Sequence, residues 1–114
     1  MSELKTFQDL YGSWADKTFP YSTEDTIASH FREESIEFAG GVVIDSVTGE
    51  PLRIAASHDP EEAADCLLLL IHHAHKNHYD LFEEAKKKGM ICIGRTWDIE
   101  DDQGKGHFRH KEER

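Results

Sequence analysis

One segment constrains the fold of this chain more than any other. Cys66–Ile71 is a run of six apolar residues, and it follows Asp59–Glu62, which supplies a capping aspartate, a proline at the first helical position and two acids in the first turn. These signals predict a helix from about 59 to 77. Because a helix that is apolar on all sides is normally buried among other helices, the segment predicts the central helix of an all-α bundle.

Other segments also have helical periodicity. In the first of them, one apolar stripe is formed by Leu4, Phe7, Leu10, Tyr11 and Trp14. The three further helices are expected at about 4–18, at 23–39 and from Asp80 onward. Between them, the segment 42–57 is expected to form either a short β-hairpin or an ordered loop insertion. We therefore expect a four-helix bundle over residues 1–97 and a charged C-terminal tail over residues 98–114.

Composition excludes several classes of function. The chain has 23 acidic and 13 basic residues and a net charge of −10, with 14 acidic and 5 basic residues before position 80. This balance argues against a nucleic-acid partner and against docking on anionic membranes. The longest apolar run is too short to span a bilayer, and the N-terminus lacks the apolar stretch of a signal peptide. With only two cysteines, the chain is expected to be cytoplasmic.

A carboxylate occupies a core-facing position in the second predicted helix. Ile27, Phe31 and Phe38 mark its apolar face at i, i+4 and i+11, and the position at i+7 is Glu34. Glu37 lies three residues further on and points roughly the same way. Burying such charges without compensation would be costly, so their placement needs an explanation.

The central helix has a similar pair, Glu62 and Asp65, just before its apolar segment. Two helices thus each direct two carboxylates toward the bundle interior, where like charges must take up protons or hold a cation. Oxygen ligands favour Mg²⁺ or Mn²⁺ over zinc. The alternative interpretation is that these acids form a solvated face and stabilise helix N-termini through the helix dipole.

The acidic pattern resembles a known signature. Glu33-Glu34-x-x-Glu37 followed by Glu62-x-x-Asp65 is similar to the EExxE…ExxD motif of the MazG-like all-α nucleoside triphosphate pyrophosphohydrolases. Within that superfamily, several ordered matches resemble the small bacterial and phage dATP/dGTP pyrophosphohydrolases. They are Thr6–Tyr11, Phe19-Pro20, His30–Glu34, Glu61–Leu70 and Arg95–Trp97.

The resemblance implies a fold, a reaction and a set of residues. The fold is a MazG-like helical bundle, and the reaction is the hydrolysis of a purine (deoxy)nucleoside triphosphate to the monophosphate and pyrophosphate. The metal ligands it implies for Mg²⁺ or Mn²⁺ are Glu34, Glu37, Glu62 and Asp65. Glu33 and Glu34 are the implied catalytic residues, with Glu33 orienting water, acting as a base or only pairing with a cation.

The resemblance also implies substrate contacts and assembly. Lys88 and Arg95 match basic positions that would contact phosphates, and Trp14 is the candidate for stacking a purine. The implied substrates are dATP and dGTP, and some phage members favour guanine nucleotides and supply precursors for 2-aminoadenine DNA. Relatives form homodimers or homotetramers, so the same is expected here.

Two alternatives are left open by the residues. The first is a non-enzymatic, acidic helical interaction protein in which the glutamate pairs are only a solvated face. The second concerns His72, His75 and His78, whose spacing could form a zinc site. Histidines near a helix C-terminus are also favoured by the dipole alone.

Overall fold

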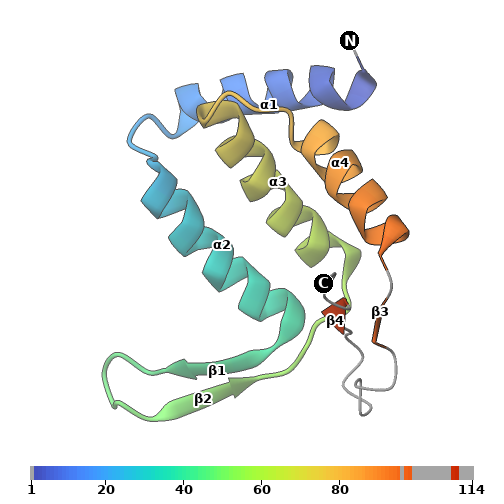
Figure 1. Ribbon diagram of the computed structural model, residues 1–114. Helices are drawn as coiled ribbons and strands as arrows, with labels where there is room; N and C mark the ends of the chain where they lie inside the picture. The colour runs from blue at the N-terminus through green and yellow to red at the C-terminus, as the bar shows by residue number, and fades with distance from the viewer. Residues whose placement is uncertain (1, 96, 99–108, 111–114) are drawn as a thin grey trace. The chain divides into compact units, whose positions relative to one another are not determined.

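The computed structural model describes residues 2–95, 97–98 and 109–110, and it divides the chain into two compact units (Figure 1). The first unit is Met1–Leu81 and the second is Phe82–Arg114. Most of the predicted tail, 98–114, lies outside the described residues.

Three helices form the first unit, and local capping explains where each begins. The helix α1 spans Glu3–Thr18, α2 spans Glu24–Ala39 and α3 spans Pro60–Lys76. At α1, Ser2 accepts a hydrogen bond from the Lys5 backbone N–H (3.1 Å). A reciprocal capping box of Thr23 and Thr26 starts α2, and Asp59 accepts from the Glu61 backbone N–H (2.9 Å) at α3.

The segment between α2 and α3 forms a β-hairpin rather than a loop. Strands β1 (Gly41–Ile44) and β2 (Pro51–Ile54) pair antiparallel, with Gly41 opposite Ile54 and Ile44 opposite Pro51. The chain enters the hairpin directly from α2 through Gly40, whose φ is +78°. A Cβ there would lie 2.7 Å from the carbonyl oxygen of Ile54, so glycine is required at this junction.

The second unit contains most of the fourth predicted helix. This helix, α4, spans Leu81–Gly94 and runs through Gly89 without ending there. Two short strands, β3 (Trp97–Asp98) and β4 (Arg109–His110), pair antiparallel. The expected four helices and hairpin are thus confirmed, and none of the described helices is long and apolar enough to cross a membrane.

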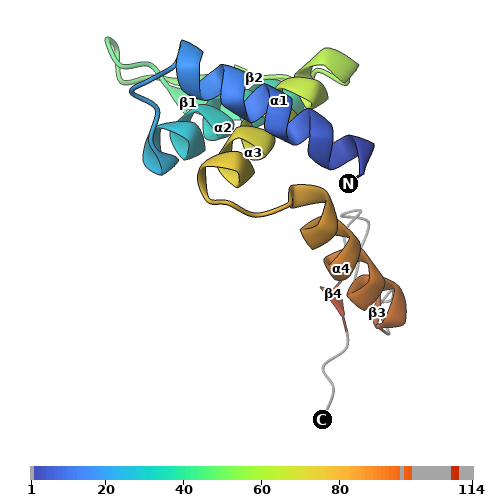
Figure 2. The same cartoon turned by 90° about the horizontal axis from the view of Figure 1, so that it is seen from above.

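Helix α3 is the centre of the first unit because it packs against both α1 and α2 (Figures 1 and 2). The buried apolar residues are Ala15, Ile27, Ile71 and Ala74. The prediction that α3 is buried on every side was wrong. Leu67 and Leu70 are 42% and 37% exposed, since α1 and α2 cover only part of its circumference.

The apolar stripe of α1 does not face this core either. Phe7, Leu10 and Trp14 are 45%, 69% and 51% exposed, whereas the buried residues of α1 are Gln8, Gly12 and Ala15. Gln8 is satisfied by hydrogen bonds to the segment after α3. Its Nε2–H donates to the Tyr79 carbonyl (2.7 Å), and its Oε1 accepts from the Leu81 N–H (3.0 Å). A hydrogen-bonded glutamine and two small residues, not the large apolar side chains, are therefore the buried residues of α1.

We predict that Gly12→Ala destabilises the protein even though alanine is the better helix former. A Cβ at position 12 would lie 2.2 Å from Cγ of His75, so α1 and α3 would have to separate. The expected loss is about 1–3 kcal/mol of unfolding free energy in denaturant titration.

Gly89→Ala is the matched control for this substitution, because among the described residues no atom lies within 4 Å of a Cβ at position 89. This variant should be neutral or gain up to about 1 kcal/mol from helix propensity. Equal effects of the two substitutions would contradict close packing at Gly12.

Candidate metal and nucleotide site

Carboxylates from two helices meet in the first unit. Glu34 of α2 and Glu62 and Asp65 of α3 each offer an oxygen, and these three atoms lie within 4.8 Å of one another. Glu34 reaches this position because it lies on the core-facing side of α2, as its spacing from Ile27 predicts. Glu62 and Asp65 are three residues apart and therefore lie on one side of α3.

The free protein bears an electrostatic cost at this cluster. One oxygen of Glu34 and one of Glu62 are buried, and no described hydrogen-bond donor reaches either of them. Burial first, and then the negative charges of Glu37 and Asp65, raise the pKa of both Glu34 and Glu62. The same acids, after burial itself, raise the pKa of the Cys66 thiol. Ionising the cluster is therefore unfavourable unless a cation offsets it.

The structure brings some of the predicted site residues together and leaves others outside the cluster. Glu34, Glu62 and Asp65 come together, and Glu37 lies near enough for its charge to act on two of them. Glu33 is exposed and is not part of the cluster. Lys88 and Arg95 belong to the second unit, so their predicted contacts with phosphate stay predictions.

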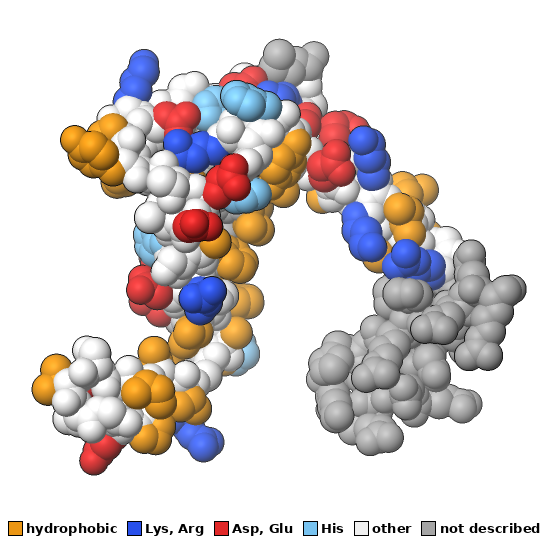
Figure 3. All heavy atoms as spheres, turned by 60° about the vertical axis from the view of Figure 1, so that its left-hand side comes forward, with side chains coloured by type: hydrophobic (Ala, Val, Ile, Leu, Met, Phe, Trp, Pro, Cys, Tyr) orange, Lys and Arg blue, Asp and Glu red, His pale blue; other side chains and the backbone are white. Residues whose placement is uncertain are grey.

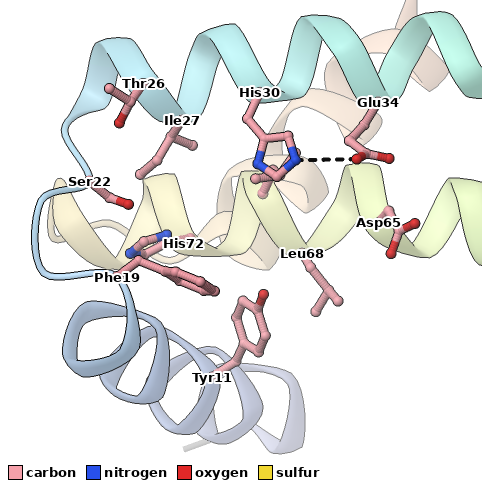
Figure 4. A pocket seen from close by; sticks show the side chains of 11 residues that line it. Tyr11, Phe19, Ser22, Thr26, Ile27, His30, Glu34, Asp65, Leu68 and His72 are labelled. Carbon is pink, nitrogen blue, oxygen red and sulfur yellow. Dashed lines mark hydrogen bonds and ion pairs between the residues drawn. The ribbon is translucent and has the colours of Figure 1, made fainter.

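A cavity of about 390 Å³ opens beside the carboxylates (Figure 4). Glu34 and Asp65 are at one end, and Phe19, Ser22 and His72 are at the other. Its remaining walls are formed by Tyr11, Thr26, Ile27, His30, Leu68 and Leu69. The cavity thus combines a carboxylate end with largely apolar walls, which is the usual composition of a small-molecule site.

One residue of the cavity wall also supports the cluster. His30 precedes Glu34 by one helical turn, and its Nε2 lies 3.2 Å from Glu34 Oε1, as the dashed line in Figure 4 shows. This leaves the other carboxylate oxygen of Glu34 for a different partner. The hydrogen bond therefore orients Glu34 toward Asp65.

At the far end of the cavity, two histidines of α3, His72 and His75, pair with Asp16 of α1. Asp16 Oδ1 accepts from His72 Nε2 (2.9 Å) and lies 3.3 Å from Lys76 Nζ, and Asp16 Oδ2 lies 3.4 Å from His75 Nε2. Burial opposes the ionisation of Asp16, but His72 and Lys76 outweigh it and lower the Asp16 pKa. Among the described residues, the glutamate and aspartate cluster is the one group with metal-holding geometry, and His78 is not part of it.

The aromatic residues of the cavity are different from the one predicted. Trp14 is not among the lining residues, but its ring contacts Tyr11 and Phe19, which are, at centroid distances of 5.5 and 5.6 Å. Burial, and then the charge of Asp65, raise the pKa of Tyr11. Tyr11, Phe19 and His72 line the cavity but were not predicted as site residues. Only the position of His72 seven residues after Asp65, on the same helical face, could have indicated it.

These residues fit a divalent cation. Two buried, unpaired carboxylate oxygens and a third nearby are the donors that Mg²⁺ and Mn²⁺ prefer, and no sulfur or imidazole competes within the three-residue cluster. A cation bound there would remove the electrostatic cost of ionising Glu34 and Glu62.

The fold is that of the MazG-like pyrophosphohydrolases. The chain is similar to a solved structure, the cyanophage S-2L MazG-like pyrophosphohydrolase bound to dGDP and three catalytic Mn²⁺ ions per active site. The two share 24% sequence identity, with a TM-score of 0.68 over 99% of this chain and 97% of that chain. No protein-family model and no curated protein sequence matches this chain. The expected fold class is thereby confirmed.

We predict that Mn²⁺ stabilises the protein through this cluster. At a concentration one hundred times its dissociation constant, the ion should add about 2.7 kcal/mol and raise the midpoint of thermal unfolding by about 10 °C. Glu62→Gln should lose most of this shift. Without metal, the same variant should melt above the wild type, because a like charge has been removed from beside Glu34 and Asp65.

Glu61→Gln is the matched control, because it makes the same chemical change one residue away at an exposed position outside the cluster. It should keep the full Mn²⁺ shift. Equal shifts in the two variants, measured by differential scanning fluorimetry with and without a chelator, would show that the ion binds elsewhere.

Proposed function

We propose that this protein is a metal-dependent pyrophosphohydrolase that converts purine (deoxy)nucleoside triphosphates, dATP or dGTP, to the monophosphate and pyrophosphate in the cytoplasm. The observation that carries this proposal is the convergence of Glu34, Glu62 and Asp65 beside a cavity large enough for a nucleoside. The structurally similar phage enzyme supports it, since that protein binds dGDP and Mn²⁺.

The carboxylates would hold Mg²⁺ or Mn²⁺. Glu34, Glu62 and Asp65 are the proposed ligands, and Glu37 joins them from the next turn of α2. A bound divalent cation would neutralise the phosphates and polarise the bond that is cleaved. His30 would help to hold the Glu34 carboxylate in place for this role, since its Nε2 lies 3.2 Å from Glu34 Oε1. Because a triphosphate is strongly anionic, the acidic cluster would repel it without such a cation.

Hydrolysis would proceed by attack of water on the α-phosphorus. The bond from the α-phosphorus to the oxygen that bridges to the β-phosphate breaks, and pyrophosphate leaves with that oxygen. Glu33 is the proposed group that orients the water or accepts its proton. Lys88 and Arg95 are the proposed contacts for the phosphates, since both are cationic and could stabilise charge on the leaving group.

The cavity would receive the nucleoside. With the phosphates at the end formed by Glu34 and Asp65, the sugar and base extend between α1, α2 and α3 toward Phe19 and His72. Apolar and aromatic walls suit the faces of a purine. Trp14 would support this stacking surface through Tyr11 and Phe19.

The convergence of the carboxylates favours an enzyme over a non-enzymatic acidic interaction protein. In the second case, Glu34 and Asp65 would be expected to lie apart or in open solvent. The Glu34 side chain is instead 18% exposed, and one of its oxygens is buried without a hydrogen bond.

We predict that the protein with Mn²⁺ or Mg²⁺ releases pyrophosphate from dGTP or dATP. In H₂¹⁸O, the label should enter the monophosphate, because water attacks the α-phosphorus. Asp65→Asn should reduce kcat by about two orders of magnitude or more, since it removes a charged ligand from the cluster. Release of orthophosphate, or label in pyrophosphate, would overturn this mechanism.

The matched control for Asp65→Asn is Glu61→Gln, which also removes one carboxylate charge from α3 but lies outside the cluster. It should keep wild-type turnover. Circular dichroism of both variants would show that the helices are intact. Equal activity in the two variants would contradict the proposed site.

We further propose that the chain forms a homodimer or homotetramer. The support is the apolar surface that the first unit exposes, on α1 and on α3, part of which is visible in Figure 3. Exposed apolar patches of this kind mark interaction surfaces. Sedimentation equilibrium should give two or four times the chain mass of 13.0 kDa. A monomer at micromolar concentration would exclude this assembly.

A further inference from the structure

His72 is the most buried polar residue in the cavity wall, with only 4% of its surface exposed. Its Nε2–H donates to Asp16 Oδ1 over 2.9 Å. Since a histidine has two ring nitrogens, this hydrogen bond leaves Nδ1 as the one that can meet a ligand. In Figure 4, His72 lies between Ser22 and Phe19, at the end of the cavity away from the carboxylates.

Asp16 holds this ring in a defined orientation. Its carboxylate is itself held by Lys76 (3.3 Å) and His75 (3.4 Å), so three groups of α3 converge on one side chain of α1. Because Asp16 is a carboxylate and can only accept a hydrogen bond, the Nε2 atom that contacts it must carry a proton. The ring is therefore held through Nε2, and Nδ1 is the nitrogen left for a partner in the cavity.

The distance from the metal cluster is appropriate for a base. His72 follows Asp65 by seven residues on α3, which corresponds to about 10 Å along the helix axis. A nucleotide whose phosphates lie at Asp65 would place its base, not its sugar, at that distance. Adenine and guanine differ along the edge that would face His72, because adenine has an N6 amino donor where guanine has an O6 acceptor.

We propose that His72, oriented by Asp16, forms a hydrogen bond through Nδ1 with the edge of the base and determines which purine the site prefers. His72 is a specificity-determining residue, and Asp16 acts through it as a positioning residue. The proposal rests on the proposed function, because it assumes that phosphates bind at the carboxylate end. It adds a polar contact that selects among bases, which stacking alone does not.

The test compares kcat/KM for dGTP and dATP in the wild type and in His72→Phe, which keeps a planar ring and removes both nitrogens. The ratio of the two values should move toward one by about tenfold, which corresponds to one hydrogen bond of about 1.4 kcal/mol. Asp16→Asn keeps the imidazole but changes the group that orients it. It should move the ratio by about threefold, and it decides the question if His72→Phe does not fold.

His75→Asn is the matched control. His75 is on the same helix and contacts the same Asp16, but it does not line the cavity. It should move the ratio by much less than Asp16→Asn does, because Lys76 and His72 still hold Asp16. A purely structural role for His72 would also weaken the metal cluster, so Mn²⁺ binding without nucleotide is measured by electron paramagnetic resonance. That affinity should stay within about twofold of the wild type in His72→Phe, because His72 is two turns from Asp65.

The outcomes separate this inference from the proposed function. A wild-type ratio near one, an unchanged ratio in both His72→Phe and Asp16→Asn, or an equal change in His75→Asn would overturn the role of His72. Absence of turnover in the wild type would overturn the proposed function instead. In that case, the dissociation constants of dGDP and dADP are measured by calorimetry in the presence of Mn²⁺. Their ratio in the wild type and in the variants then tests the role of His72 without turnover.

Discussion

The close contact between α1 and α3 at Gly12 is the constraint on which the rest of the first unit depends. Because position 12 has no side chain, α1 lies directly against His75. The same approach brings Asp16 within hydrogen-bond distance of His72 and brings Tyr11 near enough to Asp65 for its charge to raise the Tyr11 pKa. One wall of the cavity and the orientation of its histidine therefore follow from one missing Cβ.

On the side of α3 that faces α2, the main feature is repulsion between carboxylates and not close packing. Glu34, Glu62 and Asp65 are held together although two of their oxygens are buried and unpaired. If these carboxylates only stabilised the fold, a lysine or an arginine would be expected to pair with their buried oxygens. Leaving them to be satisfied by a cation is consistent with a site in which stability of the free protein is reduced for binding. The cavity beside them is where the proposed nucleotide would meet that cation.

Much of the fold could be predicted because its signals are local. The caps at Thr23 and Asp59 and the break at Gly40 located the helices to within about one residue, since capping satisfies backbone groups near in sequence. Glu34 was found as a core-facing acid by helical spacing alone. Spacing failed for α1, where the apolar stripe through Phe7 and Leu10 is exposed and Gln8, Gly12 and Ala15 are buried. Apolar periodicity therefore defined a face of α1 without showing which face contacts α3.

The sequence by itself determined the helices, the position of the hairpin segment and the acidic signature, and it predicted a hard divalent cation. Each of these depends on residue type and on spacing within one element. The tertiary structure decided which carboxylates actually meet, that His72 and His75 pair with Asp16, and that Tyr11 and Phe19 line the cavity while Trp14 lies behind them. These outcomes depend on how two helices approach each other. For α1 and α3, that approach was set by a glycine and a buried glutamine, which a hydrophobic pattern does not reveal.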